Sequence, residues 1–258
     1  MLTAMEDQVY AYHSQSEDRH WWFVSRRRIL APLIDACMKD HPGGLVVDVG
    51  CGTGGTVAWL SSRYACVGID SSEQAIAMAR RKYPQGNFHC GALENKLPSL
   101  APQTALYMLM DVLEHILDDR GFLTQIVAVM RPGARLLITV PADLALWSEH
   151  DDAANHLRRY DAPGLAALWR DLPVKLLAAT PFNARLYPFI RTARLIGRRL
   201  GIFTGKGGCD LATPPWPLND LLTMIFSGER DRVSALLDKP GGKPFRHGTS
   251  LLALLERI

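Results

Sequence analysis

The sequence has few cysteines and no excess of charge of either sign. Its cysteines are scattered and form no Cys-x-x-Cys pair, which argues against a zinc ribbon or a disulfide framework and favours a reducing compartment. Lysine and arginine number 29 against 26 aspartates and glutamates, for a formal net charge of +3. A field this weak argues against a nucleic-acid binder that works through its overall charge. The five cysteines are Cys37, Cys51, Cys66, Cys90 and Cys209.

Long hydrophobic runs are also missing. No uninterrupted apolar segment approaches the roughly 18 residues that span a bilayer. Residues 1–28 contain acidic side chains and no apolar signal-peptide region. Glycine (21) and proline (16) occur at average frequency, which excludes collagen-like and disordered classes. We therefore expect a cytoplasmic protein whose 258 residues form one large domain or one domain with an embedded subdomain.

Between residues 45 and 182, short apolar segments alternate with segments of helical pattern. The apolar segments are continuous, which is typical of strands buried on both faces of a parallel sheet. Helices between them would cover both faces of that sheet. The predicted fold class is therefore α/β, with a doubly wound, mostly parallel sheet. The expected strands are residues 45–49, 65–70, 87–90, 105–110, 135–141 and 174–179.

The alternation ends after Phe182. A helical pattern is followed by a segment rich in glycine and proline, then by two short helices and a second segment rich in glycine and proline. A final apolar run then has the pattern of a strand. We interpret the region as an insertion or lid, after which the chain returns to the sheet. The segments are residues 183–200, 201–217, 218–226, 231–237, 239–244 and 249–255.

A glycine-rich turn joins the first expected strand to a helix. Gly50, Gly52 and Gly55 would let the backbone and its N–H groups approach a ligand closely. Asp48 lies two residues before the first glycine, where a carboxylate would repel a dinucleotide pyrophosphate but would suit a cationic group. Asp70 ends the second strand and is placed to accept two ribose hydroxyls.

Four sequence motifs occur in the same order as in the class I S-adenosylmethionine-dependent methyltransferases, and residues 40–180 resemble that family. S-adenosylmethionine carries a sulfonium and an amino group, which Asp48 suits. The resemblance implies a Rossmann-like, seven-stranded sheet whose last strand is antiparallel, and it implies S-adenosylmethionine as the cofactor. It also implies that Leu93 packs on the adenine. The motifs are Val-Val-Asp-Val-Gly-Cys-Gly-Thr-Gly at 46–54, Ile-Asp-Ser-Ser at 69–72, Asp-Val-Leu-Glu-His-Ile at 111–116 and Arg-Pro-Gly at 131–133.

The expected organisation has four parts. They are an N-terminal helical segment covering the cofactor site (1–40), the Rossmann-like cofactor-binding domain (41–182), a mainly helical lid insertion on the acceptor side (183–245) and the closing strand (246–258). The residues predicted to bind the cofactor are Trp22, Arg26, Asp48, Gly50, Cys51, Gly52, Asp70, Ser71, Ala92, Leu93, Asp111, Val112 and His115.

An aromatic cluster, His-Trp-Trp-Phe at 20–23, precedes three arginines in the N-terminal segment. Trp22 and Arg26 are i,i+4 partners and can present one helix face together. Two interpretations stay open: the aromatics pack the helix on the sheet, or the helix crosses the cofactor and an arginine binds its carboxylate. The cluster is similar to the start of a subset of bacterial methyltransferases.

The segment after the fifth strand leaves the ligand-binding end of the sheet and is rich in polar side chains. A hydroxyl or amine acceptor must lose a proton, and a histidine suits that role. His150 and His156 are therefore the candidate bases. The alternative is that the segment only folds the loop, with two aspartates paired to Arg158 and Arg159. A metal site built from residues 149–151 and 156 lacks a recognisable spacing, so we predict none.

The helix expected at 185–200 combines apolar residues at helical spacing with five arginines. We expect its apolar stripe to pack on the domain while its charges remain solvated. The alternative is contact with an anionic membrane surface, since basic amphipathic helices bind such surfaces. The oligomeric state does not follow from the sequence.

The leading hypothesis is methyl transfer to an oxygen or nitrogen nucleophile, with carbon as a lesser alternative, of a small-molecule acceptor. A second hypothesis is a lyase or cyclase on the same fold, which would release methylthioadenosine instead of S-adenosylhomocysteine. A non-catalytic partner with the same fold is a third. Nucleic-acid methylation ranks last because residues 111–114 are Asp-Val-Leu-Glu, not the Asn/Asp-Pro-Pro-aromatic run that holds an extruded base.

Overall fold

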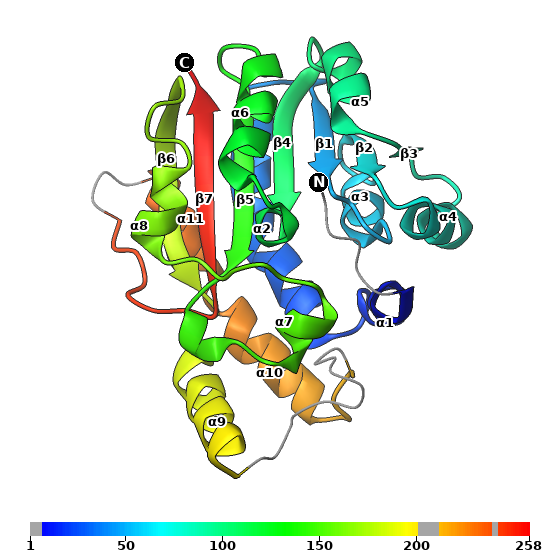
Figure 1. The fold of residues 1–258 in the computed structure, drawn as a ribbon. Coiled ribbons are helices and arrows are strands. Elements are labelled where there is room, and N and C mark those ends of the chain that lie inside the picture. The colour runs from blue at the N-terminus through cyan, green and yellow to red at the C-terminus, as the bar shows by residue number, and fades with distance from the viewer. Residues whose placement is uncertain (1–6, 201–211, 239–241) are drawn as a thin grey trace.

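The computed structural model describes residues 7–200, 212–238 and 242–258. They form a seven-stranded sheet in the order β3-β2-β1-β4-β5-β7-β6 (Figure 1). Strand β7 runs antiparallel to its neighbours β5 and β6, whereas the remaining pairs are parallel. The predicted fold class is therefore confirmed. The strands are β1 (Leu45–Val49), β2 (Ala65–Asp70), β3 (Phe88–Cys90), β4 (Thr104–Met110), β5 (Arg135–Pro141), β6 (Val174–Phe182) and β7 (Ser250–Arg257).

Helices cover both faces of the sheet (Figure 1). Side chains alternate along a strand, so Leu106 and Met108 of β4 enter the core with α2, α10 and α11, while Tyr107 and Leu109 enter the core with α5, α6 and α8. The helices are α1 (Asp7–Ser16), α2 (Trp21–Lys39), α3 (Gly55–Leu60), α4 (Glu73–Lys82), α5 (Leu93–Leu100), α6 (Asp119–Val129), α7 (Glu149–Ala153), α8 (Ala162–Ala167), α9 (Tyr187–Leu200), α10 (Leu218–Ser227) and α11 (Arg230–Asp238). Two short 3₁₀ turns are η1 (Leu113–His115) and η2 (Leu144–Leu146).

The second half of the insertion packs on the N-terminal helix. Phe226 of α10 and Val233 of α11 are fully buried in the same core as α2. The Trp22 ring stacks on Phe226 at 5.3 Å between ring centroids and on Phe182 of β6 at 6.1 Å. Residues 212–238 are therefore part of the layer that covers one face of the sheet.

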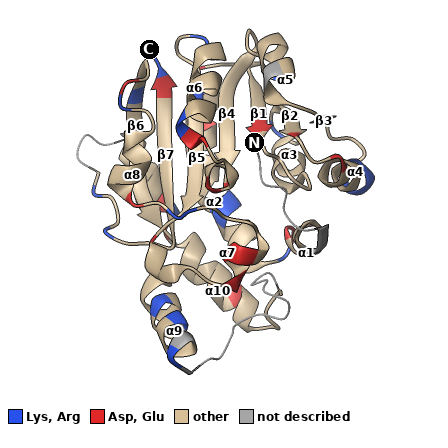
Figure 2. Cartoon of the chain, viewed as in Figure 1, with Lys and Arg blue, Asp and Glu red and all other residues tan. Residues whose placement is uncertain are grey.

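Helix α9 extends away from that layer (Figure 1) and carries a band of arginines (Figure 2). Leu186, just before the helix, is buried, but Phe189 and Ile196 are 73% and 51% exposed. The expected stripe takes either Phe189 or Ile190 at its second position, and Ile190 packs against the core, so the expectation that the stripe packs on the domain is wrong for Ile196. Contact of this helix with a membrane surface stays a prediction. Among the described residues, no helix is both long and apolar enough to cross a membrane.

Candidate active site

A cavity of about 460 Å³ lies at the carboxyl ends of β1, β4 and β5. This is the edge at which open α/β sheets bind ligands. The glycine-rich turn after β1 forms its floor, and residues of α1, α2, α7 and α9 line its other sides. The predicted binding residues that line the cavity are Trp22, Arg26, Asp48, Gly50, Cys51, Gly52, Asp111 and His115, together with the candidate bases His150 and His156.

The glycine-rich turn has a backbone conformation that requires glycine at two positions. Gly50 and Gly52 have φ angles of 74° and 53°, in the left-handed region that favours glycine. A Cβ on Gly50 would lie 2.6 Å from a methyl carbon of Val112. Val112 is buried against the turn and does not line the cavity, so the structure gives it a packing contact with the loop.

Asp48 brings a buried carboxyl group to the cavity floor. Asp48 is 3% exposed, and its Oδ1 has no hydrogen-bond partner among the described residues. Burial raises the pKa of Asp48 to about 7, with Arg26 opposing the shift and Asp70 adding to it. A buried carboxyl without a partner is suited to pairing with a cationic group of a ligand.

The residues predicted to hold ribose and adenine lie beside the cavity. The Asp70 carboxylate accepts the Gly52 and Ser72 amides, each at 2.8 Å, and burial raises the Asp70 pKa. This arrangement fixes the carboxylate next to the glycine-rich turn. The predicted residues outside the cavity lining are Asp70, Ser71, Ala92, Leu93 and Val112.

Helix α2 brings a positive charge into the cavity. The Arg26 guanidinium is 9% exposed and pairs with the Asp111 carboxylate at the end of β4. Asp111 also accepts the Thr139 hydroxyl at 3.0 Å. The Trp22 ring stacks on Phe226, as the packing interpretation of the cluster expects, and Arg26 lines the cavity, where its binding of the cofactor carboxylate stays a prediction.

The rings of three histidines, His115, His150 and His156, lie close together in the cavity lining. The ring centroids of His115 and His156 are 4.8 Å apart, and those of His150 and His156 are 6.0 Å apart. Burial, together with His156, lowers the His115 pKa to about 3, so the His115 ring is neutral. His13 and His20 from the N-terminal segment also line the cavity, and neither was among the predicted site residues.

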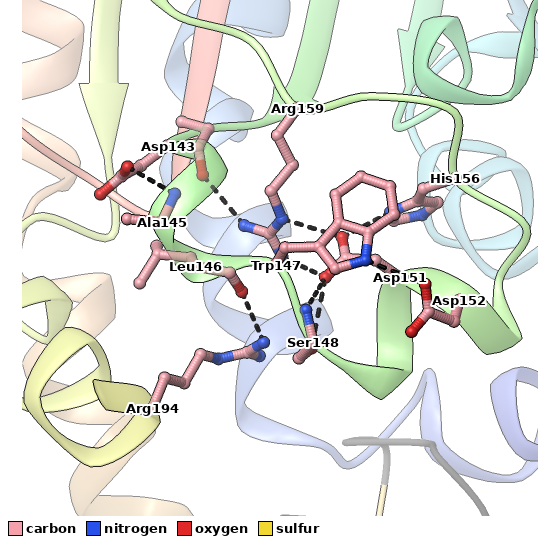
Figure 3. A network of polar contacts seen from close by, with 11 residues as sticks. Asp143, Ala145, Leu146, Trp147, Ser148, Asp151, Asp152, His156, Arg159 and Arg194 are labelled. Atoms are coloured by element: carbon pink, nitrogen blue, oxygen red, sulfur yellow. Dashed lines mark hydrogen bonds and ion pairs between the residues drawn. The ribbon is translucent and has the colours of Figure 1, made fainter. Parts of the chain in front are cut away.

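A polar network around Asp151 orients His156 (Figure 3). His156 Nδ1 lies 2.8 Å from Asp151 Oδ1, and the Arg159 guanidinium contacts both carboxylate oxygens at 2.8 and 3.0 Å. Although burial alone would raise it, His156 and Arg159 hold the pKa of Asp151 well below its usual range. The predicted loop pairing is correct for Asp151 with Arg159. It is wrong for Asp152, which accepts the Trp147 indole, and for Arg158, which pairs with Asp119.

Glu114 also faces this site, and the sequence predicted no role for it. It is fully buried in η1, and neither carboxylate oxygen has a hydrogen-bond partner among the described residues. Burial and the nearby Asp111 raise its pKa well above the usual range. Glu114, His115 and His156 offer ligand atoms that all lie within 4.8 Å of one another. The available signal was a carboxylate and a histidine between apolar residues in Val-Leu-Glu-His-Ile at 112–116.

Glu17, between α1 and α2, was also missed. Its carboxylate accepts the Thr53 hydroxyl at 2.8 Å and the Gly55 amide at 3.1 Å, and it pairs with Lys82. Glu17 thereby ties the N-terminal segment to the first turn of α3. Because these partners are 36 or more residues away along the chain, no local pattern indicates the contact.

Known proteins resemble this chain over most of its length. A family model described as a methyltransferase domain matches residues 47–138. An O-methyltransferase of Pyrenophora dematioidea is 32% identical over 211 residues, which are 75% of this chain and 77% of that protein. The O-methyltransferase cnsE of Penicillium expansum is 29% identical over 210 residues, 75% of this chain and 74% of that protein.

A solved structure has the same fold. The TehB-like S-adenosylmethionine-dependent methyltransferase of Corynebacterium glutamicum superposes with a TM-score of 0.55 over 98% of both chains, at 16% identity. The family match runs from within β1 to within β5 and includes the glycine-rich turn, and the 32% identical relative aligns with 75% of this chain. The chain therefore belongs to the class I S-adenosylmethionine-dependent methyltransferases, and it is an enzyme that transfers the methyl group of S-adenosylmethionine.

Proposed function

We propose that the methyl acceptor is an oxygen or nitrogen nucleophile of a small molecule, which enters the cavity beside His150 and His156. One observation carries this proposal: a histidine oriented by a buried carboxylate, His156 with Asp151, lies in the same cavity as the glycine-rich turn. The two relatives named O-methyltransferases support an oxygen acceptor.

The cofactor would lie along the glycine-rich turn. Asp48 would pair with a cationic group of S-adenosylmethionine, and Arg26 would bind its carboxylate, for which it must share its charge with Asp111. The ribose hydroxyls would bind Asp70, and Leu93 and the backbone at Ala92 would contact the adenine. In this placement the methyl group on the sulfonium would face the histidines.

Methyl transfer is an in-line displacement in which positioning and exclusion of water supply much of the rate. The acceptor atom forms the new bond to the methyl carbon while the carbon–sulfur bond breaks and its electron pair stays on sulfur. The proton of a hydroxyl or amine acceptor would leave to a histidine of the cluster. His150 and His156 are the candidates because both line the cavity.

Product analysis tests this function. The purified protein is incubated with S-adenosylmethionine and with phenol, carboxylic-acid and amine acceptors in separate reactions. We expect S-adenosylhomocysteine and a methylated product that depend on one acceptor class. Release of methylthioadenosine without an acceptor would contradict methyl transfer and support the lyase or cyclase alternative.

A further inference from the structure

We propose that Glu114, His115 and His156 bind a divalent transition-metal ion whose open positions face the acceptor side of the cavity. The inference deepens the proposed function, on which it rests, because it names the acceptor class as an oxygen donor. Two imidazoles and one carboxylate are a donor set that suits Zn²⁺ and similar first-row ions.

The three side chains converge at the cavity wall. Their ligand atoms all lie within 4.8 Å of one another, and the His115 and His156 rings meet edge to face at 4.8 Å between centroids. Ligands at about 2.1 Å from one ion are about 3 to 3.5 Å apart. Side-chain movements of about 1 Å therefore suffice to close the set around an ion.

Glu114 is the strongest evidence for a cation. A fully buried carboxyl group normally has hydrogen-bond or ionic partners, and each exception requires an explanation. Both oxygens of Glu114 lack a hydrogen-bond partner among the described residues, although the carboxyl adjoins a cavity lined by polar groups. A bound cation would supply the missing interaction to both oxygens.

The surroundings of His156 fit a metal ligand. Histidines that bind metals usually donate their other ring N–H to a carboxylate, which fixes the tautomer and the ring orientation. Asp151 accepts from His156 Nδ1 at 2.8 Å, which leaves Nε2 for the ion. Arg159 occupies both Asp151 oxygens, so Asp151 serves as a positioning residue and not as a ligand.

Such an ion has a defined chemical role in this cavity. A cation that contacts an acceptor hydroxyl lowers its pKa and favours the oxyanion as nucleophile. The hydroxyl proton would then leave to His150, whose ring lies 6.0 Å from that of His156. The oxygen lone pair forms the bond to the methyl carbon, and sulfur keeps the electron pair of the broken carbon–sulfur bond. No oxidant or reductant is needed.

Cobalt titration of the untagged, chelator-treated protein tests the site. We expect one Co²⁺ per chain, visible-region absorption bands and displacement by Zn²⁺. Glu114→Gln and His156→Ala should each weaken Co²⁺ binding by at least about tenfold, and Asp151→Asn by about 10- to 100-fold. His150→Ala is the matched control, since it alters a cavity histidine outside the set and should retain Co²⁺ binding.

The wild-type stoichiometry decides the proposal even where a variant does not fold. Absence of bound Co²⁺, or equal affinity in wild type and folded Glu114→Gln, would overturn the metal site. Calorimetry of the metal-free wild type with S-adenosylmethionine separates the two proposals. Cofactor binding without Co²⁺ binding would remove the metal site alone, whereas loss of methyl transfer to every acceptor would remove the proposed function.

Discussion

The two sides of the cavity are built differently. The proposed cofactor side consists mainly of the glycine-rich turn after β1 and the strand ends that flank it, to which α2 adds Arg26. The proposed acceptor side consists of side chains from α1, η1, α7 and the segment that follows α7. The difference teaches that one short stretch of chain can specify a cofactor site, whereas the acceptor site depends on contacts between distant segments.

The first prediction, with the greatest change, is a loss of methyl-transfer rate without a loss of cofactor affinity. Replacing His150 or His156 with alanine should lower the rate of methyl transfer by about 10²- to 10⁴-fold, because each removes a candidate proton acceptor or ligand from the acceptor side. Affinity for S-adenosylmethionine, measured by calorimetry, should stay within about twofold of wild type, as a purely acceptor-side role requires. A matching loss of cofactor affinity in both variants would mean that the two sides are not separate.

The second prediction concerns how the acceptor side is anchored. Phe226→Ala should lower the free energy of unfolding by about 3 to 5 kcal/mol, because a fully buried ring that stacks on Trp22 is removed. Phe189→Ala on the exposed α9 is the matched control and should change it by less than about 0.5 kcal/mol. Denaturant unfolding of both variants measures the effect, and equal losses would refute the different packing of α9 and α10.

The third prediction concerns the ribose site. Asp70→Ala should weaken S-adenosylmethionine binding by about 10- to 100-fold, since two charge-assisted hydrogen bonds are lost. Glu73→Gln, at an exposed position in the first turn of α4 and outside the predicted binding residues, is the control and should change the affinity little. Unchanged affinity in a folded Asp70→Ala variant would show that the ribose assignment is wrong.

The smallest predicted effect is a pH dependence set by Asp48. Burial raises its pKa to about 7, and Arg26 and Asp70 act on it in opposite directions. Because a cationic ligand favours the ionised form, cofactor affinity should rise about eightfold from about pH 6 to about pH 7.5. Burial lowers the pKa of His13 to about 3 and of His20 to about 4, so both stay neutral over this range.

Asp48→Asn is the control for the pH dependence. The amide does not titrate, so calorimetry of this variant should give an affinity that is weaker and that no longer changes over the same pH range. A variant that kept the wild-type pH profile would show that another group titrates, and the pairing of Asp48 with the cationic part of the ligand would then be wrong.

The fold and the position of the glycine-rich turn could be predicted because their signals are local. The apolar runs determine the buried strands, and the left-handed turn at Gly50 and Gly52 follows from residues that sit beside one another in the chain. The α/β fold class and the position of the glycine-rich turn were predictable for this reason, whereas the antiparallel last strand was implied by the resemblance to the methyltransferase family.

The acceptor side was predictable only in part because its contacts are long-range or lack a sequence pattern. The rings of His115 and His156 meet although η1 and the segment after α7 are far apart in the sequence, and His13 reaches the cavity from a helix that precedes the sheet. His156 was singled out by its residue type, but its pairing with Asp151 was not foreseen. Glu114 lies inside a predicted motif, yet only the fold reveals that its carboxyl group is buried with no hydrogen-bond partner in the part of the chain that the structure describes.

A crystal structure with S-adenosylhomocysteine bound tests the division of the cavity most directly. We predict that the ribose contacts Asp70, that the homocysteine part lies between Asp48 and Arg26, and that the sulfur faces His115, His150 and His156. A cofactor whose sulfur faces away from these histidines would contradict the account, because the acceptor side would then lie elsewhere in the molecule.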